Sequence, residues 1–205
     1  MLYIDCGDSC IKAFGKEFVF RPSFSNLANI GTPSELSAVF SDLFMVGFEN
    51  FIADVPLSCQ QIATRERSRR LLPAALQVLW ACTEDDLTAL TGGYTPSAKG
   101  LRYQVGFMPI NDIITMARHL LFHGMIGDKP PKASGGRKYK KDFDPTEWID
   151  FAIVHLGIEE EKAQQLSMTR LQRLIATKYP EDENKDYPTR EEYKALKAHL
   201  AKKAA

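Results

Sequence analysis

The sequence predicts a mainly α-helical protein with a small β component (α+β), divided into two unequal parts. Two observations lead to this prediction. Apolar residues recur at helical spacing in several segments that begin with helix start signals, and a short segment rich in β-formers stands near the N-terminus. The 205 residues include 44% apolar and 25% charged residues, which is ordinary for a globular protein.

The β component is expected to be an N-terminal hairpin. Residues 11–14 and 18–21 are rich in β-formers and flank 15–17, where Gly15 can adopt the positive φ of a tight turn. Pro22 lacks an amide donor, so we expect it to end the second strand. The hairpin should pack on the helices that follow.

Three helices are predicted in the rest of the first part, which we place at residues 1–127. Thr32 and Glu35 form a capping box around Pro33, and the helix after them has an apolar stripe. The second helix should span about 69–82. The third starts near Pro109 and ends at one of two glycines. The possible last residues of this third helix are Gly124 and Gly127. The apolar stripe of the first helix consists of Leu36, Val39, Phe40 and Leu43. Between the second and third helices, 91–96 reads as a loop and 101–105 as a short strand.

Residues 128–142 are expected to form a flexible basic linker. They carry six lysines and arginines against Asp128 and Asp142, a net charge of +4, and hold almost no apolar side chain. Such a segment buries too little surface to offset the entropy of ordering it. The linker would separate the first part from a small helical domain at 143–205.

The C-terminal domain should consist of short helices. Asp144 can cap the first, which Gly157 would end, and a second helix is expected over 159–165. Thr169 and Thr189 are the predicted caps of two more. About 60 residues give a small core, so this domain should be only marginally stable by itself.

The composition also limits the classes of function. Lysine plus arginine and aspartate plus glutamate each number 26, so the net charge is zero and general nucleic-acid coating is not favoured. No apolar run is long enough to cross a membrane, and the N-terminus lacks the pattern of a secretory signal. We therefore expect a cytoplasmic protein whose four cysteines are free thiols.

Two motifs could in principle carry chemistry. Gly7, Asp8 and Ser9 resemble the serine block of one esterase family, but no Asp-x-x-His follows to activate the serine, so we interpret them as a polar turn. His119 and His123 have the spacing of two metal ligands on a helix. They lack an intervening glutamate and an obvious third ligand, so a position near the helix C-terminus is the simpler interpretation.

Two further sequence patterns do not meet the requirements of a zinc site or of a phosphate-binding loop. Cys6 and Cys10 have no second cysteine or histidine pair to complete a zinc site. Lys99 and Gly100 follow two glycines without matching a phosphate-binding loop. The sequence thus predicts no catalytic, cofactor-binding or metal-binding residues, and a protein that is not an enzyme.

Two basic segments could bind an acidic protein or a nucleic acid. Four arginines lie within 65–70, a pattern that is usual for a solvated helix start and could also meet phosphate or an acidic partner. Residues 159–178 read as two helices around a short turn, similar to a helix-turn-helix, with Arg170, Arg173 and Lys178 as candidate groove contacts. The turn lacks glycine and the domain is net negative, so we disfavour DNA binding.

Several short stretches resemble an uncharacterised family of tailed-bacteriophage proteins. They cover much of the chain in the same order: 20–24 (FRPSF), 30–33 (IGTP), 108–112 (MPIND), 123–127 (HGMIG), 166–169 (LSMT) and 175–180 (IATKYP). Members of this family look like products of the tail-gene region that act as tail assembly chaperones. The resemblance brings no catalytic residues with it.

This resemblance implies a non-enzymatic tail-morphogenesis factor in the host cytoplasm. Its expected partners are the phage tape measure protein and the tail tube protein, and we expect it to form a homo-oligomer and to bind no membrane. Two alternatives remain open: a small nucleic-acid-binding regulator that uses the helix-turn-helix-like segment, and a minor structural protein of the virion.

Overall fold

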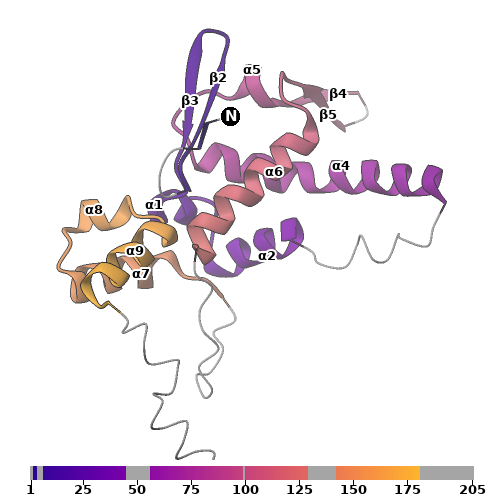
Figure 1. Ribbon diagram of the computed structural model, residues 1–205. Coiled ribbons are helices and arrows are strands. Elements are labelled where there is room, and N and C mark those ends of the chain that lie inside the picture. Colours follow the sequence, from indigo (N-terminus) through magenta and orange to yellow (C-terminus); the bar gives the residue numbers. More distant parts are fainter. Residues whose placement is uncertain (1, 4–6, 45–55, 99, 129–141, 181–205) are drawn as a thin grey trace, which may run out of the picture. The chain divides into compact units, whose positions relative to one another are not determined.

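The computed structural model describes residues 2–3, 7–44, 56–98, 100–128 and 142–180 (Figure 1). It confirms a mainly α-helical fold with two small antiparallel hairpins. The strands are β1 (Leu2–Tyr3), β2 (Ser9–Ala13), β3 (Lys16–Phe20), β4 (Gly92–Ser97) and β5 (Gly100–Val105). The helices are α1 (Phe24–Ala28), α2 (Pro33–Phe44), α4 (Leu57–Ala81), α5 (Thr88–Thr91), α6 (Ile110–Leu121), α7 (Pro145–Phe151), α8 (Glu160–Gln164) and α9 (Met168–Lys178), with π-helical turns η2 (Phe122–Ile126) and η3 (Ala152–Leu156).

The N-terminal hairpin is confirmed, with its turn one residue earlier than predicted. β2 lies between β1 and β3, and Ala13 pairs with Lys16. The loop is therefore Phe14 and Gly15, with φ of 53° and 71°, the geometry of a type I′ turn. Lys16 already belongs to β3, which ends before Pro22 as expected. The prediction missed the register because phenylalanine rarely adopts positive φ.

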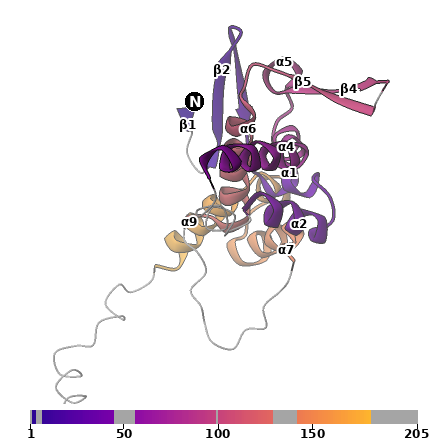
Figure 2. The same ribbon diagram turned by 90° about the vertical axis from the view of Figure 1, so that its right-hand side faces the viewer.

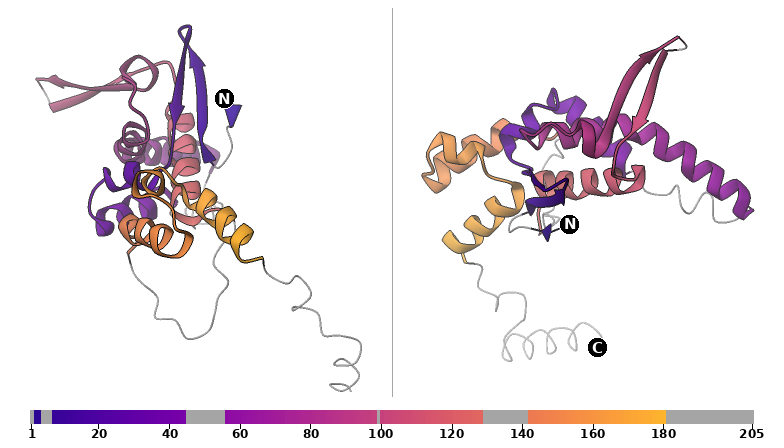
Figure 3. Two further views of the ribbon diagram at one scale, coloured as in Figure 1. Left: turned by 90° about the vertical axis from the view of Figure 1, so that its left-hand side faces the viewer. Right: turned by 90° about the horizontal axis from the view of Figure 1, so that it is seen from above.

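The second hairpin corrects the prediction for 91–96. This segment is not a loop: from Gly92 onward it forms β4, paired with β5 from Gly92 opposite Val105 to Ser97 opposite Gly100. A Gly-Gly-Tyr-Thr-Pro-Ser sequence has weak strand propensity, so its extended form depends on the pairing with β5. Figures 2 and 3 show this hairpin extending away from the helices.

Two of the predicted helix caps are confirmed, and a third lies at a different residue. The Thr32 amide and hydroxyl donate to Glu35 Oε2 at 2.8 and 2.9 Å, and the Glu35 amide points back to Thr32 Oγ1 at 3.4 Å. Asp144 Oδ1 accepts from the Thr146 amide at 2.9 Å at the start of α7. At α9 the cap is Ser167 rather than Thr169, since Ser167 Oγ accepts from the Arg170 amide at 3.2 Å.

The core forms where α4 packs along α6, with α2 against both. Only the second half of α4 contributes to it: Leu72, Ala75, Leu76, Val78 and Leu79 are buried, whereas 57–71 are exposed or half-buried. α4 starts at Leu57, well before the predicted position near 69. Its first half has no apolar stripe, so periodicity could not reveal it.

The division of the chain differs from the predicted one. Met1–Leu174 form one compact unit and Ile175–Ala205 a second, so 143–174 pack with the first part. The Phe24 amide donates to the Leu166 carbonyl at 2.9 Å, and Gln172 Nε2 donates to the Ile126 carbonyl at 2.7 Å. The predicted linker, apart from its ends, and the helix predicted after Thr189 lie outside the described residues.

Candidate functional site

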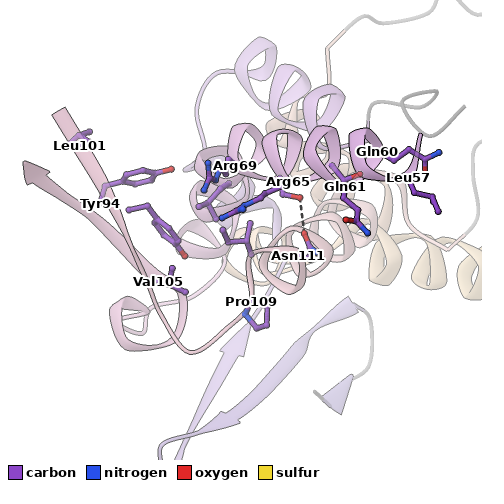
Figure 4. A pocket seen from close by; sticks show the side chains of 15 residues that line it. Leu57, Gln60, Gln61, Arg65, Arg69, Tyr94, Leu101, Val105, Pro109 and Asn111 are labelled. Atoms are coloured by element: carbon purple, nitrogen blue, oxygen red, sulfur yellow. Dashed lines mark hydrogen bonds between the residues drawn. The ribbon is translucent and has the colours of Figure 1, made fainter. Parts of the chain in front are cut away.

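A groove of about 930 Å³ lies between the first half of α4, one face of the β4–β5 hairpin and the start of α6 (Figure 4). It is open to solvent, and two other cavities of the described chain have volumes of about 850 and 220 Å³. The lining residues are Leu57, Gln60, Gln61, Thr64, Arg65, Ser68, Arg69 and Leu72 of α4, Tyr94, Leu101, Tyr103 and Val105 of the hairpin, and Pro109, Ile110 and Asn111 at α6.

The hairpin presents an apolar face to this groove. The register sets Tyr94 opposite Tyr103 and Pro96 opposite Leu101, and side chains two residues apart share a face. Val105 belongs to the same face, whereas Thr95, Arg102 and Gln104 belong to the other. Leu101 and Val105 are 73% and 69% exposed, which is unusual for the apolar side of an amphipathic hairpin. This face is therefore available to cover another apolar surface.

The base of the hairpin is held by a close backbone approach. A Cβ on Gly106 would lie 2.2 Å from the Gly92 nitrogen and 2.6 Å from the Leu90 carbonyl oxygen. The Met108 amide donates to the Leu90 carbonyl at 2.8 Å, and the Tyr103 hydroxyl donates to the Thr91 carbonyl. Only a residue without a side chain permits this crossing, which sets the direction in which the hairpin leaves the helices.

The α4 wall of the groove is basic. Arg65 and Arg69 are four residues apart and so lie on one side of the helix, and Figure 4 shows both on the groove side. Arg69 Nη1 pairs with Glu66 Oε1 at 3.2 Å, but Glu66 does not line the groove. None of the described lining residues is acidic. Ser68 Oγ donates to Asn111 Oδ1 at 3.0 Å and connects this wall to α6.

The Gly7-Asp8-Ser9 motif leads into β2 beside His123. Ser9 is fully buried, and its hydroxyl makes no hydrogen bond within the described part of the chain. Asp8 Oδ2 lies 3.7 Å from Arg21 Nε. A Cβ on Gly7 would lie 2.3 Å from the His123 Cβ, so the motif packs directly on this histidine. The sequence did not predict this approach, because 116 residues separate the two positions.

His123 itself is part of a polar contact between η2 and α9. Its Nδ1 is hydrogen-bonded to Thr169 Oγ1 at 2.8 Å and lies 3.4 Å from Asp128 Oδ1. Asp128 Oδ2 also pairs with Arg173 Nη2 at 3.1 Å. Since Thr169 and Asp128 both face Nδ1, this nitrogen is occupied by structural contacts and is not directed at Ser9 by any hydrogen bond of the described chain.

His119 and His123 lie against each other with ring centroids 4.5 Å apart. Burial lowers the pKa of both: the neighbouring His123 lowers that of His119 further, and Arg173 lowers that of His123 while Asp128 raises it. Among the described residues no three His, Cys, Asp or Glu side chains gather as a metal site would require. Their contact is that of two packed aromatic rings.

The other candidate residues are dispersed. Cys10 and Cys82 are buried free thiols, and burial raises the pKa of Cys82 to about 12, so this thiol stays protonated. Cys6 and Lys99 lie outside the described residues. On α9, Arg173 faces Asp128, while Arg170 lines a second, more polar cavity together with Asp8 and Ser167.

We expect stability to fall as the pH drops through the histidine range. The folded protein lowers the pKa of His119 and His123 from 6.5, so below about pH 6.5 the unfolded chain binds more protons than the folded one. The stabilisation is fully present above that pH and is lost as the pH falls through the lowered pKa values. Urea unfolding between about pH 5 and pH 8 should show this slope, and His119→Gln should reduce it. An unchanged slope in this variant would contradict the assignment.

Replacing Ser9, His119 or His123 with alanine should leave partner binding intact apart from a loss of stability. The reason is that the described residues form no cluster of metal ligands around the two histidines and that no hydrogen bond joins His123 to Ser9. Affinity capture of the partner measures binding. Elemental analysis of protein purified without chelator measures bound metal. One equivalent of zinc that disappears in His119→Ala would contradict this prediction.

Fold and groove together define a mainly helical protein with an open groove that is partly apolar and partly basic. The chain belongs to the Family of unknown function (DUF6246), which it matches over residues 20–195. The match includes all residues that line the groove. No curated protein and no solved structure matches the chain. Within the described residues, no helix is both long enough and apolar enough to traverse a bilayer.

Proposed function

We propose that the protein is a non-enzymatic bacteriophage tail-morphogenesis factor that binds the tape measure protein, the tail tube protein or both in the host cytoplasm. The phage assignment rests on the resemblance of the short sequence motifs. The observation that carries the binding function is the exposed apolar face of the β4–β5 hairpin opposite Arg65 and Arg69. Contiguous exposed apolar side chains are a feature of protein interaction sites.

A chaperone of an extended helical client needs such a surface. Long tape measure proteins expose apolar stripes that associate unless another protein covers them. Self-association of the chaperone would repeat the groove along the client, and we expect the unit at Met1–Leu174 to carry it. The regulator alternative has less support, because Arg173 pairs with Asp128 and the Gln172 amide nitrogen donates to the Ile126 carbonyl.

Co-expression with the tape measure protein of the same phage tests this proposal. We expect the wild-type chain to keep the tape measure protein soluble and to co-elute with it, because the hairpin face covers its apolar stripe. Leu101→Asp with Val105→Asp should reduce the co-eluting amount about tenfold or more, since two charges would have to be desolvated in the contact. Size-exclusion chromatography after affinity capture measures both outcomes.

Thr95→Asp with Gln104→Asp is the matched control, because it adds the same charge to the opposite face of the same strands. This variant should co-elute like the wild type. If the tape measure protein is equally soluble with and without the chain and never co-elutes, the proposal is wrong. Salt-sensitive DNA binding would instead support the regulator, and presence in purified particles a structural role.

A further inference from the structure

The chemistry of the groove indicates what kind of segment occupies it. We propose that it binds an amphipathic helix of a partner protein, with one apolar side and with carboxylates spaced four residues apart that pair with Arg65 and Arg69. This inference specifies the binding mode of the proposed function and depends on it only for the identity of the partner. Three features of the described residues support it.

The first feature is that side chains from both strands of the hairpin line the groove. Tyr94 comes from β4, whereas Leu101 and Val105 come from β5, and all three line the groove. A peptide that binds as an added strand would form its hydrogen bonds with the backbone of one edge strand only. A surface built by both strands instead accepts the side chains of an element laid across it, which favours helix-in-groove binding.

The second feature is the exposure of the first half of α4 among the described residues. Leu57 and Ile62 are 75% and 64% exposed, and residues 57–71 place no side chain fully in the core. Most of the stability of a helix in a protein comes from packing of one face. Within the described residues, the first half of this 25-residue helix has no fully buried side chain, so another helix has room beside it.

The third feature is the charge of the lining. Among the described lining residues Arg65 and Arg69 are the two charged ones, and residues 65–70 hold four arginines against Glu66. Four residues of α-helix rise about 6 Å. Carboxylates four residues apart on a helix lying roughly parallel or antiparallel to α4 would have the same spacing, so both ion pairs can form together. Lysines at these positions would face like charges.

Binding of designed peptides to the full chain tests the proposal. The probes are fluorescently labelled helices of about 18 residues with leucines along one face and either glutamates or lysines flanking it four residues apart, plus a scrambled glutamate peptide. We expect the glutamate helix to bind about tenfold or more tightly than the other two. Arg65→Glu with Arg69→Glu should reverse the preference in favour of the lysine helix. Fluorescence anisotropy measures the affinities, and binding of the lysine helix shows that the variant is folded.

Arg70→Glu with Arg102→Glu is the control, because it changes the net charge equally at exposed arginines that do not line the groove. This variant should keep the wild-type preference. The proposal is overturned if no peptide binds, if the scrambled peptide binds as well as the helix, or if both double variants behave alike.

The same variants separate this proposal from the broader one. If Arg65→Glu with Arg69→Glu captures the tape measure protein as well as the wild type does, the binding mode proposed here is wrong and the tail function stands. If the glutamate helix binds the groove but the tape measure protein is never captured, the binding mode stands and the tail function is wrong.

Discussion

A chain that ends after Asp128 is expected to lose most of its cooperative unfolding transition, whereas a chain that ends after Pro180 should keep it. The reason is that 143–174 belong to the same compact unit as the first part and bury apolar side chains of their own. Leu171 and Met168 are 0% and 4% exposed, and burying each contributes about 1.5–3 kcal/mol. Removing them exposes the apolar surface that they cover.

The hydrogen bonds lost in the shorter chain add to this effect. The amides of Phe24 and Gln172 donate across the boundary, and Thr169 is bonded to His123. Each such bond contributes about 1 kcal/mol. Together with the lost burial, the expected loss is comparable with the whole stability of a typical domain, about 5–15 kcal/mol. Urea unfolding followed by circular dichroism measures it for both truncated chains.

The opposite result would restore the division that the sequence predicts. If the chain ending after Asp128 unfolds with the midpoint and slope of the chain ending after Pro180, then 143–174 contribute nothing to the first unit. In that case 143–205 would be a separate domain and 128–142 its linker. The two truncated chains differ only in residues 129–180, so a difference between them cannot arise from residues 181–205.

The sequence predicts well those elements that short-range chemistry specifies. The capping box of Thr32 and Glu35, the Asp144 cap and the first hairpin each depend on residues a few positions apart. The strand at 101–105 and the apolar face of α6 are also found by alternation and by helical spacing. In each case the local preference and the tertiary environment agree, so a single sequence is enough.

The groove could not be predicted in this way because its walls come from distant segments. Arg65 and Tyr94 line the same cavity although 29 positions separate them, and the first half of α4 lacks an apolar stripe. β4 has the composition of a turn and becomes a strand through pairing with β5. The arginines at 65–70 were noticed as a charge run, but nothing in the sequence assigns an apolar hairpin face to them.

The Gly7 approach to His123 and the cap at Ser167 were missed for a related reason. Glycine and serine have many roles, and a sequence pattern does not say which neighbour they meet. The same holds for Gly106, which reads as an ordinary end of a strand. Its role becomes visible only from the 2.2 Å between its would-be Cβ and the Gly92 nitrogen.

Gly106→Ala is expected to destabilise the protein and to weaken partner binding together. The new methyl group would overlap the Gly92 nitrogen and the Leu90 carbonyl oxygen, and both are backbone atoms that cannot move aside as a side chain can. Forcing an extra methyl group into a closed space costs about 1–3 kcal/mol, and occasionally more. Because the crossing sets the direction of the hairpin, Tyr94, Leu101 and Val105 should shift relative to Arg65.

Gly93→Ala is the matched control, since a Cβ on Gly93 meets no atom within 4 Å. This neighbouring substitution should change the free energy of unfolding by less than about 1 kcal/mol, and it should stabilise the strand slightly if it acts through the entropy of the unfolded chain. Thermal unfolding and anisotropy with the glutamate helix measure stability and binding for both variants. If Gly106→Ala unfolds like the wild type and binds the helix equally well, the hairpin does not depend on this crossing, and the groove must be held in place by the Tyr103 hydroxyl and the strand pairing alone.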